Sequence, residues 1–332
     1  MKLNKNTTKL FLVAPANTAT GGPFLLHQLA SKLIEMGFDA KMLYIKHSEI
    51  EDPVHAFYKH FQIPYTYELE DVAENLVIFP EVYTEMIFRY KQIQKVIWWL
   101  SVDNFLDANA QKLPFSLKRF LGLKPPVHHY RFQETPPHQH WVQCYYAKHF
   151  LESKGVSNIK DLSDYLDPIF INELKNRSFN NQNKKEIVAY NPKKGYEVTQ
   201  ELIKKAPHIQ WVPIENMTPE QVKELLISAK IYIDFGHHPG KDRIPREAAM
   251  CGCIVITNRK GSAAFTEDVP IPEKFKIDYI PGQEESIIRL LENSFSNYEN
   301  ELLLFEPYKA KIENEEAVFN ADLNKIIATF FD

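Results

Sequence analysis

The stretch "KLFLVAPANTATGGPFLLHQLASKLIEMGFDAKMLYI", residues 9–45, decides the fold of the first half of the chain. The apolar run at 9–15 predicts a buried strand, and a turn-rich segment with two glycines follows it. Residues 24–37 carry apolar side chains at helical spacing and stop at Gly37, and 39–45 is a second strand-like run. A strand, a helix and a strand in this order form a parallel pair with a right-handed crossover.

The same alternation continues through the rest of the chain. In the first half, further short strands are expected at 75–80, 95–100 and 140–144. After a polar stretch at 180–185 the pattern restarts. Strands are expected at 186–192, 209–214, 230–235, 253–258 and 274–280, and helices are expected between them. Strands that alternate with helices favour open, doubly wound parallel sheets. The sequence therefore predicts an α/β protein with two similar halves and a cleft between them.

Length and composition exclude several classes of protein. The 332 residues suffice for two domains, and a net charge of -4 with 44% hydrophobic residues argues for a globular protein that does not bind nucleic acid. No apolar run is long enough to span a membrane, and the N-terminus lacks the features of a secretory signal, so we expect a cytoplasmic protein. Three cysteines are too few for a disulfide framework. Cys251 and Cys253 are expected to be core residues beside a turn.

The segment most informative about function is "DFGHHPGKDRIPREAAMCGC", residues 234–253. It follows a predicted strand and runs into a helix that we expect to begin at Pro245. Ligands of open α/β sheets bind at this end of the strands, and the unpaired N–H groups of a helix N-terminus favour an anion. Lys241 and Arg243 add positive charge, while Gly236 and Gly240 would let the backbone approach closely. The segment predicts a site for a phosphate or diphosphate.

Each of these residues also has a purely structural explanation. Glu247 lies near the third expected helical position, where a carboxylate often caps a helix. Lys241 and Arg243 could be solvated surface charges, and His237 and His238 could be polar loop residues. Their grouping within about a dozen residues at the binding end of a strand favours the ligand site.

Three other loops share this character. Residues 256–265 follow the next strand, and they place Arg259 and Lys260 before the small residues Gly261, Ser262 and Ala263, which could start a helix. Residues 190–196 follow the first strand of the second half and contain Lys193 and Lys194. An uncharged counterpart in the first half contains Gly21 and Gly22.

Almost the whole chain resembles the retaining, nucleotide-sugar-dependent GT-B glycosyltransferases that carry a Glu-x7-Glu motif. The segments concerned are "LVAPANTATGGPFLLHQLASKLIEMGFDAKML", "WVQCYYAKHFLESKG" with the following "SNIKDLSDYLDPIF", and "IDFGHHPGKDRIPREAAMCGCIVITNRKGSAAF". The resemblance implies a GT-B fold of two Rossmann-like, doubly wound domains facing each other across a cleft. It implies an acceptor domain at 1–170, a donor domain at 171–306, and a C-terminal helical segment at 307–332 that packs back on the first domain.

The resemblance also assigns roles in a donor site. Glu247 matches the second glutamate of the motif, which contacts the ribose of the donor, but Pro239 stands where the first glutamate is expected. The basic pair that neutralises the diphosphate falls on Lys193 or Lys194, with Lys241 and Arg243 as competitors. The predicted donor-binding set is Lys193, Lys194, Gly236, His237, Lys241, Arg243, Glu247, Gly261, Ser262 and Ala263, and the predicted acceptor-side residues are Gly21 and Gly22.

The implied activity is transfer of a sugar, hexosyltransferase-like, from a nucleotide sugar to a glycan or lipid-linked acceptor of a bacterial-type surface polysaccharide. The resemblance implies that neither a metal nor a cofactor takes part. Asp103 and Glu81 follow strands of the first half and could orient or deprotonate the acceptor hydroxyl, although capping or turn formation explains each equally well. His238, next to the missing glutamate, is the third catalytic candidate.

Two alternatives stay open. The missing first glutamate is compatible with a non-catalytic GT-B-like protein that binds a nucleotide or a sugar. The basic, amphipathic segment 114–126 could rest on the inner face of an anionic membrane, as a peripheral contact, or it could be an ordinary surface helix.

Overall fold

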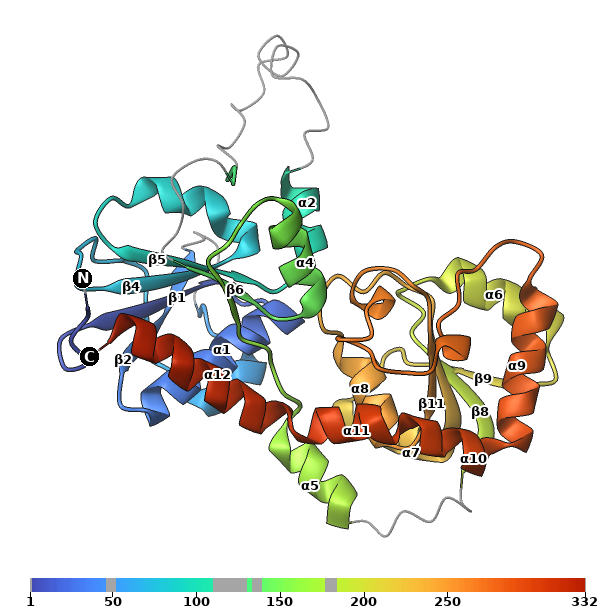
Figure 1. The fold of residues 1–332 in the computed structure, drawn as a ribbon. Coiled ribbons are helices and arrows are strands. Elements are labelled where there is room, and N and C mark those ends of the chain that lie inside the picture. Colours follow the sequence, from blue (N-terminus) through green and yellow to red (C-terminus); the bar gives the residue numbers. More distant parts are fainter. Residues whose placement is uncertain (1, 46–51, 110–129, 133–138, 177–183, 332) are drawn as a thin grey trace. The chain divides into compact units, whose positions relative to one another are not determined.

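The structure is a computed structural model that describes residues 2–45, 52–109, 130–132, 139–176 and 184–331. The chain divides into two compact units, and each contains one parallel sheet with helices packed around it (Figure 1). Unit 1 consists of Met1–Leu162 together with Ala321–Asp332, and unit 2 is Ser163–Asn320. The basic segment 114–126 lies outside the described residues, so its contact with a membrane stays a prediction. No helix in the described ranges is both long and apolar enough to cross a bilayer.

The sheet of unit 1 has the strand order β3-β2-β1-β4-β5-β6-β7, and every neighbouring pair is parallel. The pairing of β1 with β2 runs from Lys9↔Asp39 to Pro15↔Ile45, which confirms the predicted crossover unit. Strands buried on both faces read as continuous apolar runs, as in residues 10–14 of β1. The strands are β1 (Lys9–Pro15), β2 (Asp39–Ile45), β3 (Tyr65–Thr66), β4 (Leu76–Pro80), β5 (Gln94–Trp99), β6 (Gln139–Val142) and β7 (Ile159–Asp161).

The first helix begins earlier than the sequence predicts. Gly21 and Gly22 form its first turn, and Thr20 is its extended N-cap; the helix ends as expected before Gly37, whose φ is 83°. The last residues of the chain also belong to unit 1, where the Phe331 ring lies 4.8 Å from that of Phe38. The helices of this unit are α1 (Gly21–Glu35), η1 (Ala56–Phe61), η2 (Glu81–Arg89), α2 (Val102–Asn109) and α4 (Tyr145–Ser153).

The sheet of unit 2 has the order β11-β10-β8-β9 and is also wholly parallel. Its strands are β8 (Lys185–Tyr190), β9 (Gln210–Pro213), β10 (Ala229–Asp234) and β11 (Ile254–Thr257). Its helices are α5 (Pro168–Asn176), α6 (Tyr196–Lys205), α7 (Pro219–Ser228), α8 (Arg243–Met250), η4 (Ser262–Ala264), η5 (Glu273–Phe275), α9 (Glu284–Ser296), α10 (Tyr298–Leu302), η6 (Leu303–Phe305), α11 (Glu306–Glu313) and α12 (Glu315–Phe330), whose last turns run into unit 1.

The strand predicted at 274–280 is wrong. Lys276 makes a single bridge to Thr257, and the Ile277 N–H donates to the Thr257 carbonyl at 2.8 Å, but the segment forms no strand. Phe275 reaches the core from the short turn η5 instead, with 0% of its surface exposed. The alternation of apolar and polar residues here therefore reflects one buried aromatic in a turn.

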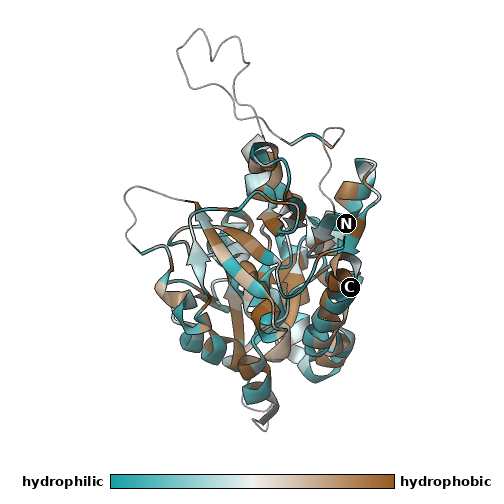
Figure 2. Ribbon diagram, turned by 90° about the vertical axis from the view of Figure 1, so that its left-hand side faces the viewer, coloured by the Kyte–Doolittle hydropathy of each residue, from teal (hydrophilic) through white to brown (hydrophobic). Residues whose placement is uncertain are grey.

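Packing of the two cores follows the predicted apolar pattern. The helices alternate between hydrophilic and hydrophobic residues along their length, as expected when one side of a helix covers a sheet (Figure 2). Cys144, Cys251 and Cys253 are free and buried, and Cys251 and Cys253 flank Gly252, whose φ is 80°. The prediction that these two are core residues beside a turn is confirmed.

Candidate functional site

The topology of unit 2 marks the place where a ligand would bind. The chain passes from β8 to β9 on one side and then crosses back to β10 on the other side of β8. In open parallel sheets, ligands bind beyond the carboxyl ends of the strands at such a reversal. Residues 191–195 follow β8 and residues 235–242 follow β10, while residues 258–262 follow the neighbouring β11. We call these segments the three sheet-end loops, and they contain most of the donor-site residues predicted from the sequence.

The first two sheet-end loops are in direct backbone contact. A Cβ atom added to Gly195 would lie 2.3 Å from the carbonyl carbon of Phe235, and one added to Gly236 would lie 2.2 Å from Cβ of Lys194. Gly195 also has a φ of 61°, which side chains rarely adopt. The close approach predicted for Gly236 therefore brings this loop against Lys194, and its contact with a phosphate stays a prediction.

The third sheet-end loop is bound to the second one just as tightly. A Cβ atom on Gly261 would lie 1.9 Å from the carbonyl oxygen of His238, and the Ser262 N–H donates to that oxygen at 2.9 Å. The Ser262 hydroxyl donates to the Gly240 carbonyl at 2.6 Å, and the buried Asn258 amide donates to the carbonyls of Phe235 and Gly236 at 2.6 Å each. Ser262 and the buried Ala263 thus shape the loop, and η4 is one short turn in place of the predicted helix.

Helix α8 starts two residues earlier than predicted. It begins at Arg243 with Asp242 as N-cap, so Pro245 stands at the third position, where a missing N–H costs little. Glu247 is then the fifth helical residue and cannot form the N-terminal cap that was its alternative role. Its carboxylate accepts from Nε of Arg243 at 2.8 Å, and burial raises the pKa of Glu247 although Arg243 and Arg246 oppose that shift.

Lys241 was predicted to bind the donor, and the structure places it elsewhere. Its ammonium group lies 2.8 Å from Glu315 and 3.5 Å from Asp164, and it donates to the Ser163 hydroxyl at 2.9 Å. The Lys241 side chain is only 9% exposed. Its charge therefore compensates buried carboxylates in this structure.

Arg246 contacts the same two carboxylates as Lys241, although no local sequence pattern indicates this role. The guanidinium donates to Asp164 and, at 2.7 Å, to Glu315, so two cations face two carboxylates. Its side chain is 2% exposed, and the pKa of Arg246 is raised because the two carboxylates outweigh the effect of burial. We call Lys241, Arg246, Asp164 and Glu315 the buried ion-pair network. It fixes the start of unit 2 and the start of α12 to the second sheet-end loop.

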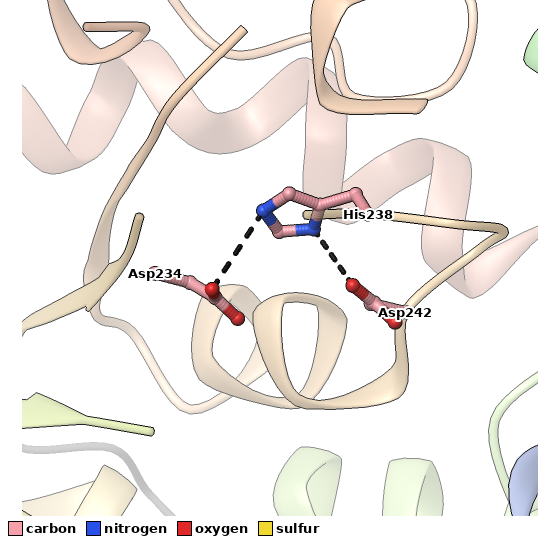
Figure 3. A group of neighbouring side chains, drawn as sticks. All are labelled: Asp234, His238 and Asp242. Carbon is pink, nitrogen blue, oxygen red and sulfur yellow. Dashed lines mark ion pairs between the residues drawn. The ribbon is translucent and has the colours of Figure 1, made fainter. Parts of the chain in front are cut away.

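A second group of charges links the first two sheet-end loops to the end of β10. His238 stands between two carboxylates, with Nδ1 2.8 Å from Asp242 and Nε2 3.8 Å from Oδ1 of Asp234 (Figure 3). Asp242 also accepts from the Lys194 ammonium, at 2.9 and 2.8 Å to its two oxygens. We call Asp234, His238, Asp242 and Lys194, in this order, the charge chain.

The electrostatics of the charge chain favour alternating charges. Burial alone would lower the pKa of His238, but the hydrogen bond with Asp242 and the charges of both carboxylates raise it. Burial alone would raise the pKa of Asp242, but the hydrogen bond and charge of His238 and the charge of Lys194 lower it. Burial raises the pKa of Asp234 despite the charges of His238 and Lys194. The imidazole is therefore positioned to be positively charged.

This geometry changes the role predicted for His238. Its side chain is 1% exposed and both ring nitrogens face carboxylates, so it offers no group to a substrate. The side chain is buried below the loop, and the prediction that it acts directly in catalysis is not supported. His237, its neighbour, is exposed.

Within the described ranges, one set of side chains has the spacing of metal ligands. Ligand atoms of Asp234, His238 and Asp242 all lie within 4.8 Å of one another. However, the imidazole ring occupies the space between the two carboxylates, and Asp242 is already bound by the Lys194 ammonium. Asp234 also accepts from the Gly236 N–H at 2.9 Å and from the Tyr232 hydroxyl at 3.1 Å. In this structure the three side chains therefore bind one another and Lys194 through ion pairs and hydrogen bonds.

The remaining predicted cations are more accessible. Lys193 and Lys260 are exposed, the Lys194 side chain is 30% exposed, and that of Arg243 is 48% exposed. Arg259 is partly exposed and lies 3.6 Å from Asp278, besides an ion pair with Glu273. The accessible cations at this end of the sheet are therefore Lys193 and Lys194 in the loop after β8, Lys260 in the loop after β11 and Arg243 in the first turn of α8.

Unit 1 gathers its own candidates at the carboxyl ends of its strands. Glu81 follows β4, and its Oε2 accepts the Leu100 N–H at 2.9 Å, at the end of β5. A Cβ atom on Gly22, in the first turn of α1, would lie 3.7 Å from the Leu100 side chain, and one on Gly21 would meet no atom of the described residues within 4 Å. Asp103 is half-buried and accepts from the Tyr146 hydroxyl at 3.0 Å.

The two acidic candidates of unit 1 have different environments. Glu81 is 3% exposed, and burial raises its pKa to about 7 although backbone N–H groups of Leu100, Glu81 and Ser101 oppose the shift. A carboxyl group with a pKa near neutrality suits a general base. The hydrogen bond from the Leu100 N–H to Glu81 also joins the residue after β4 to the residue after β5, which is a structural role of its own.

The two parallel sheets, one in each unit, define the fold class of this protein. Two units with parallel, doubly wound sheets form a GT-B type fold, as predicted. Solved structures similar to this chain include HepE of Anabaena in complex with UDP-glucose, which is 10% identical, with 96% of this chain and 99% of that chain covered and a TM-score of 0.60.

Two further solved structures share the fold over nearly their whole length. Sucrose-phosphate synthase from Thermosynechococcus elongatus is 12% identical, with 97% of this chain and 100% of that chain covered and a TM-score of 0.63. WaaG, a glycosyltransferase involved in lipopolysaccharide biosynthesis, is 12% identical, with 97% and 99% covered and a TM-score of 0.56. No family model and no curated protein matches the sequence. At these identities the similarity establishes the fold.

Proposed function

We propose that this protein is a glycosyltransferase that moves a sugar from a nucleotide-sugar donor to a glycan or lipid-linked acceptor in the synthesis of a bacterial-type surface polysaccharide. The observation that carries the proposal is the set of three sheet-end loops, which interlock at the topological reversal of unit 2. The GT-B fold, shared over nearly the full chain with HepE, sucrose-phosphate synthase and WaaG, supports it.

In this proposal the donor diphosphate lies beside Lys193, Lys194 and the first turn of α8. The ammonium groups and the unpaired N–H groups of the helix would stabilise the charge that builds on the leaving phosphate. Arg243 is half-exposed and could turn from Glu247 to the phosphate. Glu247 would then accept from the ribose hydroxyls. The proposed reaction retains the anomeric configuration and uses no metal.

Glu81 and Asp103 are the acceptor-side candidates of the proposal. Burial raises the pKa of Glu81 to about 7, which would suit proton transfer from a sugar hydroxyl near neutral pH, but its side chain is 3% exposed, so acceptor binding would have to uncover it. Asp103 is half-buried and accepts from the Tyr146 hydroxyl. Gly21 and Gly22 expose the N-terminus of α1 close to the same strand ends. These assignments give each unit one substrate.

One observation favours the alternative of a non-catalytic binding protein. Pro239 stands where the motif has its first glutamate, and Lys241 is committed to Asp164 and Glu315. Both changes remove groups that a transferase could direct at the donor. A protein of this kind would bind a nucleotide sugar without cleaving it.

The test is a panel of nucleotide sugars, beginning with UDP-glucose, in which binding is measured by calorimetry and cleavage by release of nucleoside diphosphate. The proposal expects one donor to bind and to be slowly hydrolysed without acceptor. Lys193→Ala with Lys194→Ala should weaken binding about tenfold or more, because each charged contact is worth about 1.5–3 kcal/mol. Lys204→Ala is the matched control, since Lys204 lies on α6 and pairs with Glu201. Binding without hydrolysis selects the alternative, and no binding contradicts both.

A further inference from the structure

The charge chain connects a fully buried acid to an accessible cation. Asp234 ends β10, His238 lies in the second sheet-end loop, Asp242 occupies the N-cap position of α8 without a side-chain cap hydrogen bond, and Lys194 extends from the first sheet-end loop. The exposed fractions of the side chains rise along it, from 2% and 1% for Asp234 and His238 to 21% and 30% for Asp242 and Lys194. Only the Lys194 end is open to a ligand.

The state of His238 sets the balance of charge in this chain. With a positive imidazole, the two carboxylates face two cations and the group is neutral. With a neutral imidazole, one buried negative charge is uncompensated, and Asp242 depends on Lys194 alone. Asp242 then attracts the Lys194 ammonium more strongly, and that ammonium is less available to bind another anion, such as a phosphate.

We propose that His238 is a positioning residue: its positive charge neutralises Asp242 and thereby leaves the Lys194 ammonium available to the phosphate of a nucleotide sugar. This inference rests on the proposed function for the identity of the ligand. It assigns a role to a histidine that does not itself reach the substrate. It also makes donor binding dependent on the protonation of the buried His238 imidazole.

The groups around the imidazole determine the sign of the pH effect. Asp234 faces it from β10, with the Tyr232 hydroxyl donating to that carboxylate, and Asp242 faces it from the N-cap of α8. The charge of Lys194, on the loop after β8, opposes protonation of the ring, and the loop after β11 places the backbone of Gly261 and Ser262 against the His238 carbonyl. The carboxylates raise the pKa of His238 above its usual 6.5. His238 is therefore charged below that pH and loses its proton as the pH rises through the raised pKa. Donor binding should weaken over the same range.

The experiment measures binding of UDP-glucose, or of the donor found in the panel, between pH 6 and pH 9. The diphosphate of a nucleotide sugar has no group that titrates there, but the uracil ring of UDP-glucose begins to ionise near the upper limit, so the change is assigned to the protein by comparison with His238→Gln at the same pH values. We expect the wild-type dissociation constant to rise about tenfold, the effect of one charged contact. His238→Gln should bind weakly at every pH, whereas His208→Gln, which removes an exposed histidine paired with Glu292, should keep the wild-type profile.

A double variant separates this role from simple support of the loop. Asp242 forms no side-chain cap with α8, so Asp242→Asn removes its charge without removing a helix cap. If His238 acts through the charge of Asp242, adding Asp242→Asn to His238→Gln should restore most of the lost affinity and leave it independent of pH. A double variant no better than His238→Gln, or a flat wild-type profile, overturns the inference.

The charge of His238 can also be read without a donor. Nitrogen-15 NMR of the imidazole, assigned by its loss in His238→Gln, should show both ring nitrogens protonated at pH 6 and a titration midpoint above the usual 6.5. A ring that is neutral at pH 6, or a midpoint below 6.5, overturns the inference and leaves the proposed function intact. If no nucleotide sugar binds, the proposed function fails, and the same variants are compared with inorganic pyrophosphate as the probe. Pyrophosphate binding that ignores His238→Gln overturns the inference in that case.

Discussion

Removal of the Arg246 guanidinium should destabilise unit 2 severely. In Arg246→Met the side chain keeps much of its apolar volume, but Asp164 and Glu315 retain only Lys241 of the two cations in the buried ion-pair network. Both carboxylates are buried, at 8% and 4% side-chain exposure, so the uncompensated charge cannot be solvated. Breaking a buried ion pair by removing one partner costs about 3–5 kcal/mol.

The loss should be visible in thermal unfolding. For a unit of this size, 1 kcal/mol corresponds to about 2–4 °C, so the transition of unit 2 should fall by roughly 10 °C. Calorimetry with Arg289→Ala, an exposed arginine on α9, provides the control. Addition of Glu315→Gln to Arg246→Met leaves one cation for one carboxylate and should recover part of the loss. A melting temperature within 2 °C of wild type for Arg246→Met would refute the assignment of a buried ion-pair network.

Three further changes test other parts of the account. Glu247→Gln should weaken nucleotide binding by about three- to tenfold while changing the melting temperature little, and equal affinity in calorimetry would mean that Glu247 has no ribose contact. Glu81→Gln should raise the free energy of unfolding, measured in urea, by up to about 3 kcal/mol at pH 8 but not at pH 4. Burial raises the pKa of Glu81 to about 7, so ionisation of the wild-type carboxyl destabilises the fold as the pH rises towards that value. The same gain at both pH values would contradict this. Gly261→Ala should cost about 3 kcal/mol in urea unfolding, because its φ is 62° and a Cβ atom would meet the His238 carbonyl, and an unchanged midpoint would argue against this loop contact.

The parallel strands were predictable because each carries its signal locally. Strands β1 and β2 have the bounds predicted from the sequence. Residues 10–14 of β1 are all buried, and such strands are recognised as continuous apolar runs. The segment 274–280 failed because a single buried aromatic, Phe275, imitates part of a strand pattern. Pairing with a sheet depends on neighbours that a local pattern does not contain.

The candidate site was predictable in position but not in its internal pairing. Loops after parallel strands must meet at one end of the sheet, so the sheet-end loops could be expected to lie together. Lys241 and Arg246 were misjudged or missed because their partner carboxylates are distant in sequence: Asp164 is 82 residues from Arg246 and Glu315 is 69. The same holds for Lys194 and Asp242, which are 48 residues apart. A list of cations in a loop does not show which are already neutralised.

The central claim is that the sheet-end loops of unit 2 hold a nucleotide diphosphate. The most direct measurement is mapping of backbone amide chemical shifts by NMR during titration with the nucleotide sugar that binds in the panel. The account predicts that the largest shifts fall in residues 191–196, 235–248 and 258–263, and that they are lost in the variant with Lys193→Ala and Lys194→Ala. Saturable shifts confined to unit 1, or the same shifts in that variant, would contradict it.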